Sequence, residues 1–210
     1  MAQGQNILKF RPPAPQPAGL AGRDDDGDWA LIARIGRGDE QAFEVFYKRY
    51  RRYLERFVYQ VTRRVELVDD VVSEVMLAVW QQAARTERLA LASTWVLGIA
   101  NYKSLQALRK QGVTASVDER LEEAAGDEAH GQRVFEQDNL LHAALRHLSP
   151  EQRAALELVY FHGLHYQDIA AVLNCPENTV KTRIFHARRR LREIWPQLTG
   201  ESAQASERSE

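Results

Sequence analysis

The sequence predicts an all-α fold made of two small helical domains joined by a flexible acidic linker. Apolar residues recur at helical spacing through most of the chain, and these repeats fall into two groups. Between the groups, residues 112–137 hold seven Asp or Glu against two Arg, and Gly126 and Gly131 interrupt the helical pattern. A chain of 210 residues, 44% of them hydrophobic, is long enough to form two small cores.

Both ends of the chain lack a pattern that could bury a core. Residues 1–27 contain the Pro-rich run RPPAPQPAG and the charge run DDDGD, so we expect a disordered N-terminal extension there. Residues 198–210 are polar, and we expect a disordered tail. The predicted organisation is therefore a first domain over 28–111, an acidic linker over 112–134 and a second domain over 135–197.

The first domain opens with helical patterning at Asp28, and a long helix follows for which Asp39 is the expected N-cap. Basic residues on the outer face of this helix are interpreted as a solvent-exposed surface. Those residues are Lys48, Arg49, Arg52 and Arg56. Its apolar stripe consists of Phe43, Phe46, Tyr47, Tyr50, Leu54, Phe57 and Val61.

The next helix, over 66–85, buries a valine stripe and presents an unusual outer face. That face combines carboxylates with an apolar side chain. It consists of Asp69, Asp70, Ser73, Glu74 and Leu77. Such a face suits a docking partner, but carboxylates in a first turn also stabilise the helix dipole and a single exposed leucine is ordinary. The residues themselves leave both interpretations open.

A third helix is expected over 93–111, with Ser93 or Thr94 as its cap and the connector 86–92 before it. Its periodicity does not identify one exposed face. Its polar candidates for nucleic-acid contact are Asn101, Lys103, Arg109 and Lys110.

The second domain should begin with a helix over 136–147. Ser149, Pro150 and Gln152 form a capping box that starts the next helix, which ends near Gly163. Residues 166–191 then read as a short helix, a turn at Asn174, Cys175 and Pro176, and a basic helix. This is the pattern of a helix-turn-helix.

The outer face of the basic helix predicts contact with DNA. Residues 176–195 hold six Lys or Arg against two Glu, which the net charge of −1 for the whole chain conceals. Side chains opposite the core could contact base edges, and flanking cations could contact phosphates. A charged, solvent-exposed helix is the alternative, although an exposed Phe185 suits a thymine methyl better than water. The candidates are Asn178, Thr179, Lys181, Thr182, Arg183, Phe185, His186, Arg188 and Arg189.

No cluster of residues suggests catalysis, so we expect neither an enzyme nor a cofactor. His162, His165 and Cys175 match no familiar zinc spacing, so we expect no metal site. A single cysteine excludes an intrachain disulfide, and no apolar run approaches the ~18 residues of a membrane span. We therefore expect a soluble cytoplasmic protein.

Four segments in order resemble the bacterial RNA polymerase sigma factors of the sigma-70 family, in its extracytoplasmic-function (ECF) subfamily. They are GDEQAFEVFYKRY, VDDVVSEVMLAVW, STWVLGIANYKSLQALRKQ and LSPEQRAALELVYFHGLHYQDIAAVLNCPENTVKTRIFHARRRLRE. The resemblance implies that 28–111 corresponds to sigma region 2, which binds core polymerase and the promoter −10 element. It implies that 135–197 corresponds to region 4, which binds the −35 element.

The resemblance also implies roles for individual surfaces and partners. The Asp70, Glu74 and Leu77 face would dock on the β′ clamp helices of core RNA polymerase, with the β subunit as a further contact. Residues 86–110 would engage the −10 element and help to flip a base. Partners would then be core polymerase, promoter DNA and an anti-sigma factor. The alternative from the residues alone is a stand-alone helix-turn-helix regulator whose N-terminal helices dimerise or bind an effector.

Four positions depart from the family pattern. Asn101 and Tyr102 stand where the family usually has an Arg-Asn pair, His186 stands where Arg is frequent, and Asn178 replaces a frequent Gly. We therefore expect a −35 sequence that differs from the usual one.

Overall fold

The computed structural model describes residues 24–112 and 138–198, and every regular element within them is helical. The predicted all-α fold is thus confirmed. The elements are α1 (Asp25–Ile35), α2 (Glu40–Thr62), the 3₁₀ turn η1 (Val65–Leu67), α3 (Val68–Gln82), α4 (Ala92–Lys110), α5 (Asp138–Arg146), α6 (Pro150–Tyr160), α7 (Tyr166–Leu173) and α8 (Glu177–Leu198).

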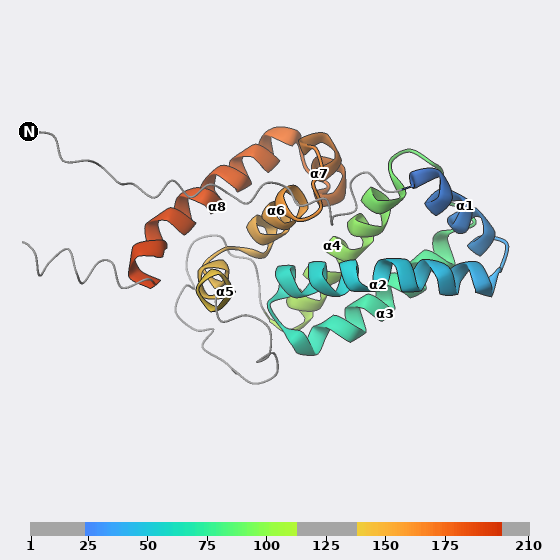
Figure 1. Ribbon diagram of the computed structural model, residues 1–210, viewed down its shortest axis with the longest axis horizontal. Helices are drawn as coiled ribbons and strands as arrows, with labels where there is room; N and C mark the ends of the chain where they lie inside the picture. The colour runs from blue at the N-terminus through green and yellow to red at the C-terminus, as the bar shows by residue number, and fades with distance from the viewer. Residues whose placement is uncertain (1–23, 113–137, 199–210) are drawn as a thin grey trace, which may run out of the picture.

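The helices form two groups that lie against each other (Figure 1). Helices α1 to α4 make one group, in which α2 packs on α1, α3 and α4; α5 to α8 make the other, in which α8 packs on α5, α6 and α7. Residues 1–23 of the extension expected over 1–27, most of the acidic linker and nearly all of the C-terminal tail lie outside the described residues.

Helix α1 begins earlier than the sequence predicted. The acidic run that we assigned to the tail is its first turn, and Asp24 is its N-cap, with Oδ1 accepting from the amide of Gly27 at 3.0 Å. Carboxylates are favoured there because the N-terminus of a helix carries partial positive charge. The predicted start at Asp28 was therefore wrong, and Asp28 itself is buried.

Helix α2 starts as predicted, but its basic face is not fully exposed. Asp39 Oδ1 accepts from the amide of Ala42 at 3.0 Å, which confirms the cap. Lys48, Arg52 and Arg56 are exposed, and Arg56 also pairs with Glu157 of α6 at 2.6 Å, whereas Arg49 is half-buried and pairs with the buried Asp28. The interpretation as a solvent-exposed surface was thus wrong for Arg49 alone.

Helix α4 lacks the cap that the sequence predicted. It begins at Ala92, its N-cap residue is Leu91, and Ser93 and Thr94 are buried within the first turn. The amide of Ala92 instead donates to Asp25 Oδ1 in α1 at 2.7 Å.

The helix-turn-helix follows the predicted order. Ser149 and Gln152 form the capping box of α6 with both of its hydrogen bonds. Asn174 ends α7 in the left-handed conformation at φ 48°, which asparagine tolerates better than most residues. Helix α8 begins at Glu177, one residue after Pro176.

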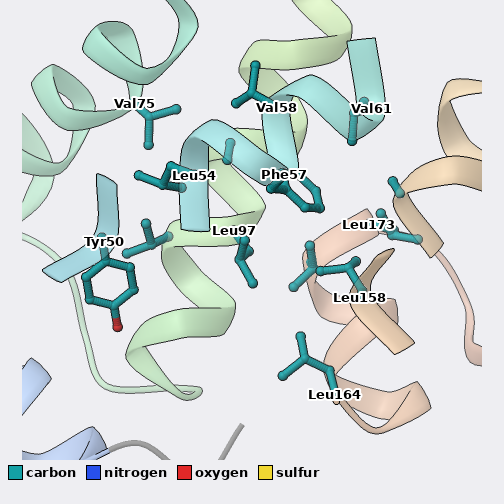
Figure 2. Packing of buried hydrophobic residues seen from close by; sticks show 14 of the residues in the cluster. Tyr50, Leu54, Phe57, Val58, Val61, Val75, Leu97, Leu158, Leu164 and Leu173 are labelled. Atoms are coloured by element: carbon teal, nitrogen blue, oxygen red, sulfur yellow. The ribbon is translucent and has the colours of Figure 1, made fainter. Parts of the chain in front are cut away.

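The contact between the two groups is buried and continuous with the cores on either side. Figure 2 shows Phe57 and Leu97 of the first group facing Leu158 and Leu173 of the second. The guanidinium of Arg153, itself buried, donates two hydrogen bonds to the carbonyl oxygen of Val61, at 3.1 and 2.7 Å. This carbonyl lies in the last turn of α2, where acceptors lack intrahelical partners and negative partial charge accumulates.

Candidate nucleic-acid interface

Helix α8 presents its predicted DNA-contact residues on its open face. Val180, Ile184, Ala187 and Leu191 are buried against the rest of the second group and fix the rotation of the helix. Phe185 is 63% exposed and lies beside His186, with ring centroids 5.5 Å apart. Exposed on the same helix are Asn178, Lys181, Thr182, His186, Arg188 and Arg189.

The two remaining candidates, Thr179 and Arg183, are half-buried. Arg183 Nη1 donates to Cys175 Sγ at 3.5 Å and so ties α8 to the turn. Arg189 pairs with Glu193 at 2.8 Å, and the Arg188 guanidinium lies 5.5 Å from the centre of the Tyr160 ring. The face thus joins cations that can hold phosphates to an aromatic ring that can contact a thymine methyl.

The outer face of α3 is open to solvent and acidic. Asp69, Asp70 and Ser73 are exposed, and Leu77 is 54% exposed. Glu74 accepts a hydrogen bond from Lys103 at 2.9 Å, and this contact holds the pKa of the Glu74 carboxyl below its usual value. The predicted docking residues therefore share one exposed face, which carries negative charge.

The predicted −10 candidates on α4 do not share a surface. Asn101 is buried at 6% exposure, and its Oδ1 has no hydrogen-bond partner among the described residues. Lys103 is held by Glu74, and Arg109 and Lys110 are exposed in the last turn. This conformation thus withdraws Asn101 from any ligand and separates it from the two exposed cations.

A pocket of about 780 Å³ lies between the connector, α4 and α7, and sequence reasoning missed it. Its aromatic wall contains Trp29 and Trp95, which stack with ring centroids 6.1 Å apart, and Tyr102, which is 60% exposed. Trp95 and Tyr102 are seven residues apart on one helix, so their shared side was detectable. The contribution of Trp29, from another helix, was not. Residues of α7, among them Val172, close one side.

Two further observations concern metal ligands and membrane-spanning helices. In the described parts of the chain, no three His, Cys, Asp or Glu side chains gather as metal ligands. Over those same residues, no helix is both long and apolar enough to cross a membrane.

Comparison with known proteins identifies both helix groups. Residues 46–114 match the family model described as sigma-70 region 2, and residues 138–191 match the model described as sigma-70, region 4. The ECF RNA polymerase sigma factor SigM of Mycobacterium tuberculosis is 31% identical over 175 residues, which cover 82% of this chain and 87% of that protein. The chain belongs to the ECF sigma factors.

Other relatives of this ECF sigma factor support the same family assignment. The RNA polymerase sigma-H factor of Pseudomonas aeruginosa is 29% identical over 173 residues, 77% of this chain and 90% of that protein. The fold resembles that of CnrH in its complex with the cytosolic domain of CnrY, with a TM-score of 0.59 at 20% identity over 80% of this chain and 97% of that one. The resemblance seen in the sequence is thus confirmed, and a stand-alone regulator is excluded because residues 46–114 match sigma region 2.

Proposed function

We propose that this ECF sigma factor joins core RNA polymerase through the α3 face, brings it to promoters by reading the −35 element with α8, and engages the −10 element with the connector and α4. It catalyses no reaction itself and acts in the cytoplasm. Helices α1 to α4 form one working domain and helices α5 to α8 the other, and the acidic linker joins them. The observation that carries the proposal is that a region 2 and a region 4 occur on one chain, each with an exposed face of suitable charge.

The α3 face suits a protein partner better than a nucleic acid. Its carboxylates would repel phosphates, whereas the exposed Leu77 offers an apolar contact at the centre of an interface. The −35 surface has the opposite character, since its cations attract phosphates and Phe185 supplies an apolar contact to bases.

The pocket beside the connector supports a role in holding an unstacked base. Stacking of a base on an aromatic side chain contributes roughly 1–3 kcal/mol, and Trp95 and Tyr102 both line this pocket. Because α7 closes one side of the pocket and Asn101 is buried, we propose that the two helix groups separate when the protein binds polymerase and promoter.

An anti-sigma partner completes the proposal. Two structures of similar fold are CnrH in complex with the cytosolic domain of CnrY and RpoE of Bartonella quintana in complex with the anti-sigma factor NepR. We propose that a comparable protein holds this sigma factor in its compact arrangement until a signal releases it.

Co-purification with core RNA polymerase, followed by promoter-dependent run-off transcription, tests the proposal. The double variant Asp70→Lys/Glu74→Lys should lose binding to core polymerase, because it reverses the charge of an exposed face, while its circular dichroism remains that of the wild type. Lys103→Ala is the matched control, because it removes the ion pair of Glu74 and leaves the α3 face unchanged. Failure of the wild-type protein to bind core polymerase at micromolar concentration would refute the function.

A further inference from the structure

In the structure the connector between α3 and α4 comprises residues 83–91, rather than the predicted 86–92. Helix α1 holds it in place through several contacts. Arg88 Nη2 pairs with Asp25 Oδ2 at 2.8 Å and with Asp26 Oδ1 at 2.6 Å. The indole nitrogen of Trp29 donates to the carbonyl oxygen of Ala90 at 3.1 Å. In Figure 1 the connector runs beside α1 before it enters α4.

Asp25 performs two tasks with one carboxylate. One oxygen binds Arg88, and the other accepts from the amide of Ala92, the first residue of α4. The first amides of a helix lack intrahelical acceptors, and Leu91, the N-cap residue, has no side-chain acceptor to offer. A residue 67 positions earlier in the chain therefore caps α4 and fixes the end of the connector.

This clamp determines the position of Leu89. The residue lies between Arg88 and Ala90, is 87% exposed, and lines the pocket together with Trp95 and Tyr102. Because the Ala90 carbonyl and the Arg88 side chain are held by α1, the backbone around Leu89 is restrained while its side chain is exposed. Apolar side chains presented in this way insert beside bases that leave the stack.

We propose that Asp25 and Trp29 are positioning residues that hold the connector so that Leu89 contacts a base of the −10 element as that base unstacks. The inference rests on the proposed function, since it requires the connector to meet promoter DNA. It adds α1, the helix that follows the N-terminal extension, to the parts of the protein that assist promoter melting.

Four single substitutions each remove a different contact of the connector. Asp25→Ala removes both the cap and the Arg88 contact, whereas Asp26→Ala removes only a partner of Arg88 and is the matched control. Trp29→Phe removes the hydrogen bond to Ala90 and keeps a ring beside Trp95. Leu89→Ala removes the proposed contact at a site too exposed to affect folding.

The test uses the full chain bound to core polymerase. The DNA is a promoter that is active in run-off transcription, and it carries the fluorescent base 2-aminopurine in its −10 element. Asp25→Ala, Trp29→Phe and Leu89→Ala should each slow the rise in fluorescence about tenfold or more on duplex DNA, because unstacking a base costs a few kcal/mol that the protein must recover. Asp26→Ala should stay within about twofold of the wild type. On a template already melted over the −10 element, the variants should initiate within about twofold of the wild type.

The outcomes separate the two proposals. If the wild type neither binds core polymerase nor initiates, the proposed function fails. If the wild type initiates but Leu89→Ala opens duplex DNA at the wild-type rate, the inference is overturned, whatever the folding of the α1 variants. A defect of Asp25→Ala that persists on the melted template would also overturn it, because the residue would then serve only the fold.

Discussion

His162 is a neutral imidazole enclosed by aromatic rings where the two helix groups meet. It is fully buried, its ring centre lies 6.0 Å from that of Phe57 and 5.2 Å from that of Phe161, and neither nitrogen has a hydrogen-bond partner among the described residues. Burial, reinforced by the nearby Arg56 guanidinium, lowers the pKa of His162 to about 3. An ionisable residue at this position makes the contact sensitive to acid.

The substitution His162→Phe should make the protein more resistant to acid. Between pH 6.5 and 3 the unfolded chain binds a proton on this imidazole that the folded protein does not, so stability falls as the pH falls through that window. The slope difference between wild type and variant should approach about 1.4 kcal/mol per pH unit well below pH 6.5. Urea unfolding from pH 7.5 to 5 measures it, and parallel curves would contradict the assignment.

Phe185→Ala tests whether the exposed face of α8 contacts DNA bases. We expect binding of the holoenzyme to its promoter to weaken about 5- to 30-fold, because an apolar contact to a base is lost. The free energy of unfolding should change by less than about 0.5 kcal/mol, since the ring is exposed. Arg189→Ala is the contrasting variant: it should weaken binding to all DNA sequences alike and reduce the salt dependence. Equal loss of sequence preference in both variants would contradict the division between base and phosphate contacts.

At the scale of elements, helix starts divide into those fixed locally and those fixed by distant residues. The capping box of α6 is local, because Ser149 Oγ accepts from the amide of Gln152 and Gln152 Oε1 accepts from the amide of Ser149. The cap of α4 is distant, because its acceptor belongs to α1.

Ser149→Ala should destabilise the protein by about 1 kcal/mol, because an amide of the first turn loses its acceptor. Gln152→Ala should cost less, and the double variant should cost less than the sum, since the two side chains form one motif. Chemical denaturation of the three variants measures these differences. Strict additivity would show that the two bonds act independently.

This division explains what the sequence could predict. Asp39 and Ser149 are adjacent to the helices that they cap, so the starts of α2 and α6 were predictable. The open faces of α3 and α8 were predictable as well, because each lies opposite a regular apolar stripe. The cap of α4 and the burial of Asn101 were not, because each depends on contacts between helices that are distant in sequence. The start of α1 is fixed locally by Asp24, but its acidic first turn was interpreted as a charge run of the tail.

At the scale of the whole molecule, the two helix groups share one buried surface. Gly98 of α4 lies against α7: a Cβ at this position would be 3.9 Å from the carbonyl oxygen of Val172, an ordinary contact. The interface also holds ionic contacts, including that of Arg56 with Glu157, whose pKa is raised by burial although Arg56 opposes the rise. The Arg56 guanidinium therefore offsets part of the cost of burying this carboxyl group.

Two substitutions at Gly98 should have opposite effects. Gly98→Ala should be accommodated and should raise stability by up to about 1 kcal/mol, because alanine favours the helix. Gly98→Leu should force α4 and α7 apart and increase the radius of gyration measured by small-angle X-ray scattering. An unchanged radius for the leucine variant would show that this contact does not hold the groups together.

The close approach of α4 and α7 at Gly98 also limits how far the two halves of this protein can be exchanged with those of relatives. A domain that binds one promoter element can be exchanged between relatives only if it folds and works as a separate unit. Here, however, a hybrid whose N-terminal half brings a large side chain to position 98 would meet the backbone at Val172 and lose the compact arrangement, even if both halves fold. The partners that a hybrid recognises would then depend on how well the halves fit each other, as well as on the recognition residues that each half carries.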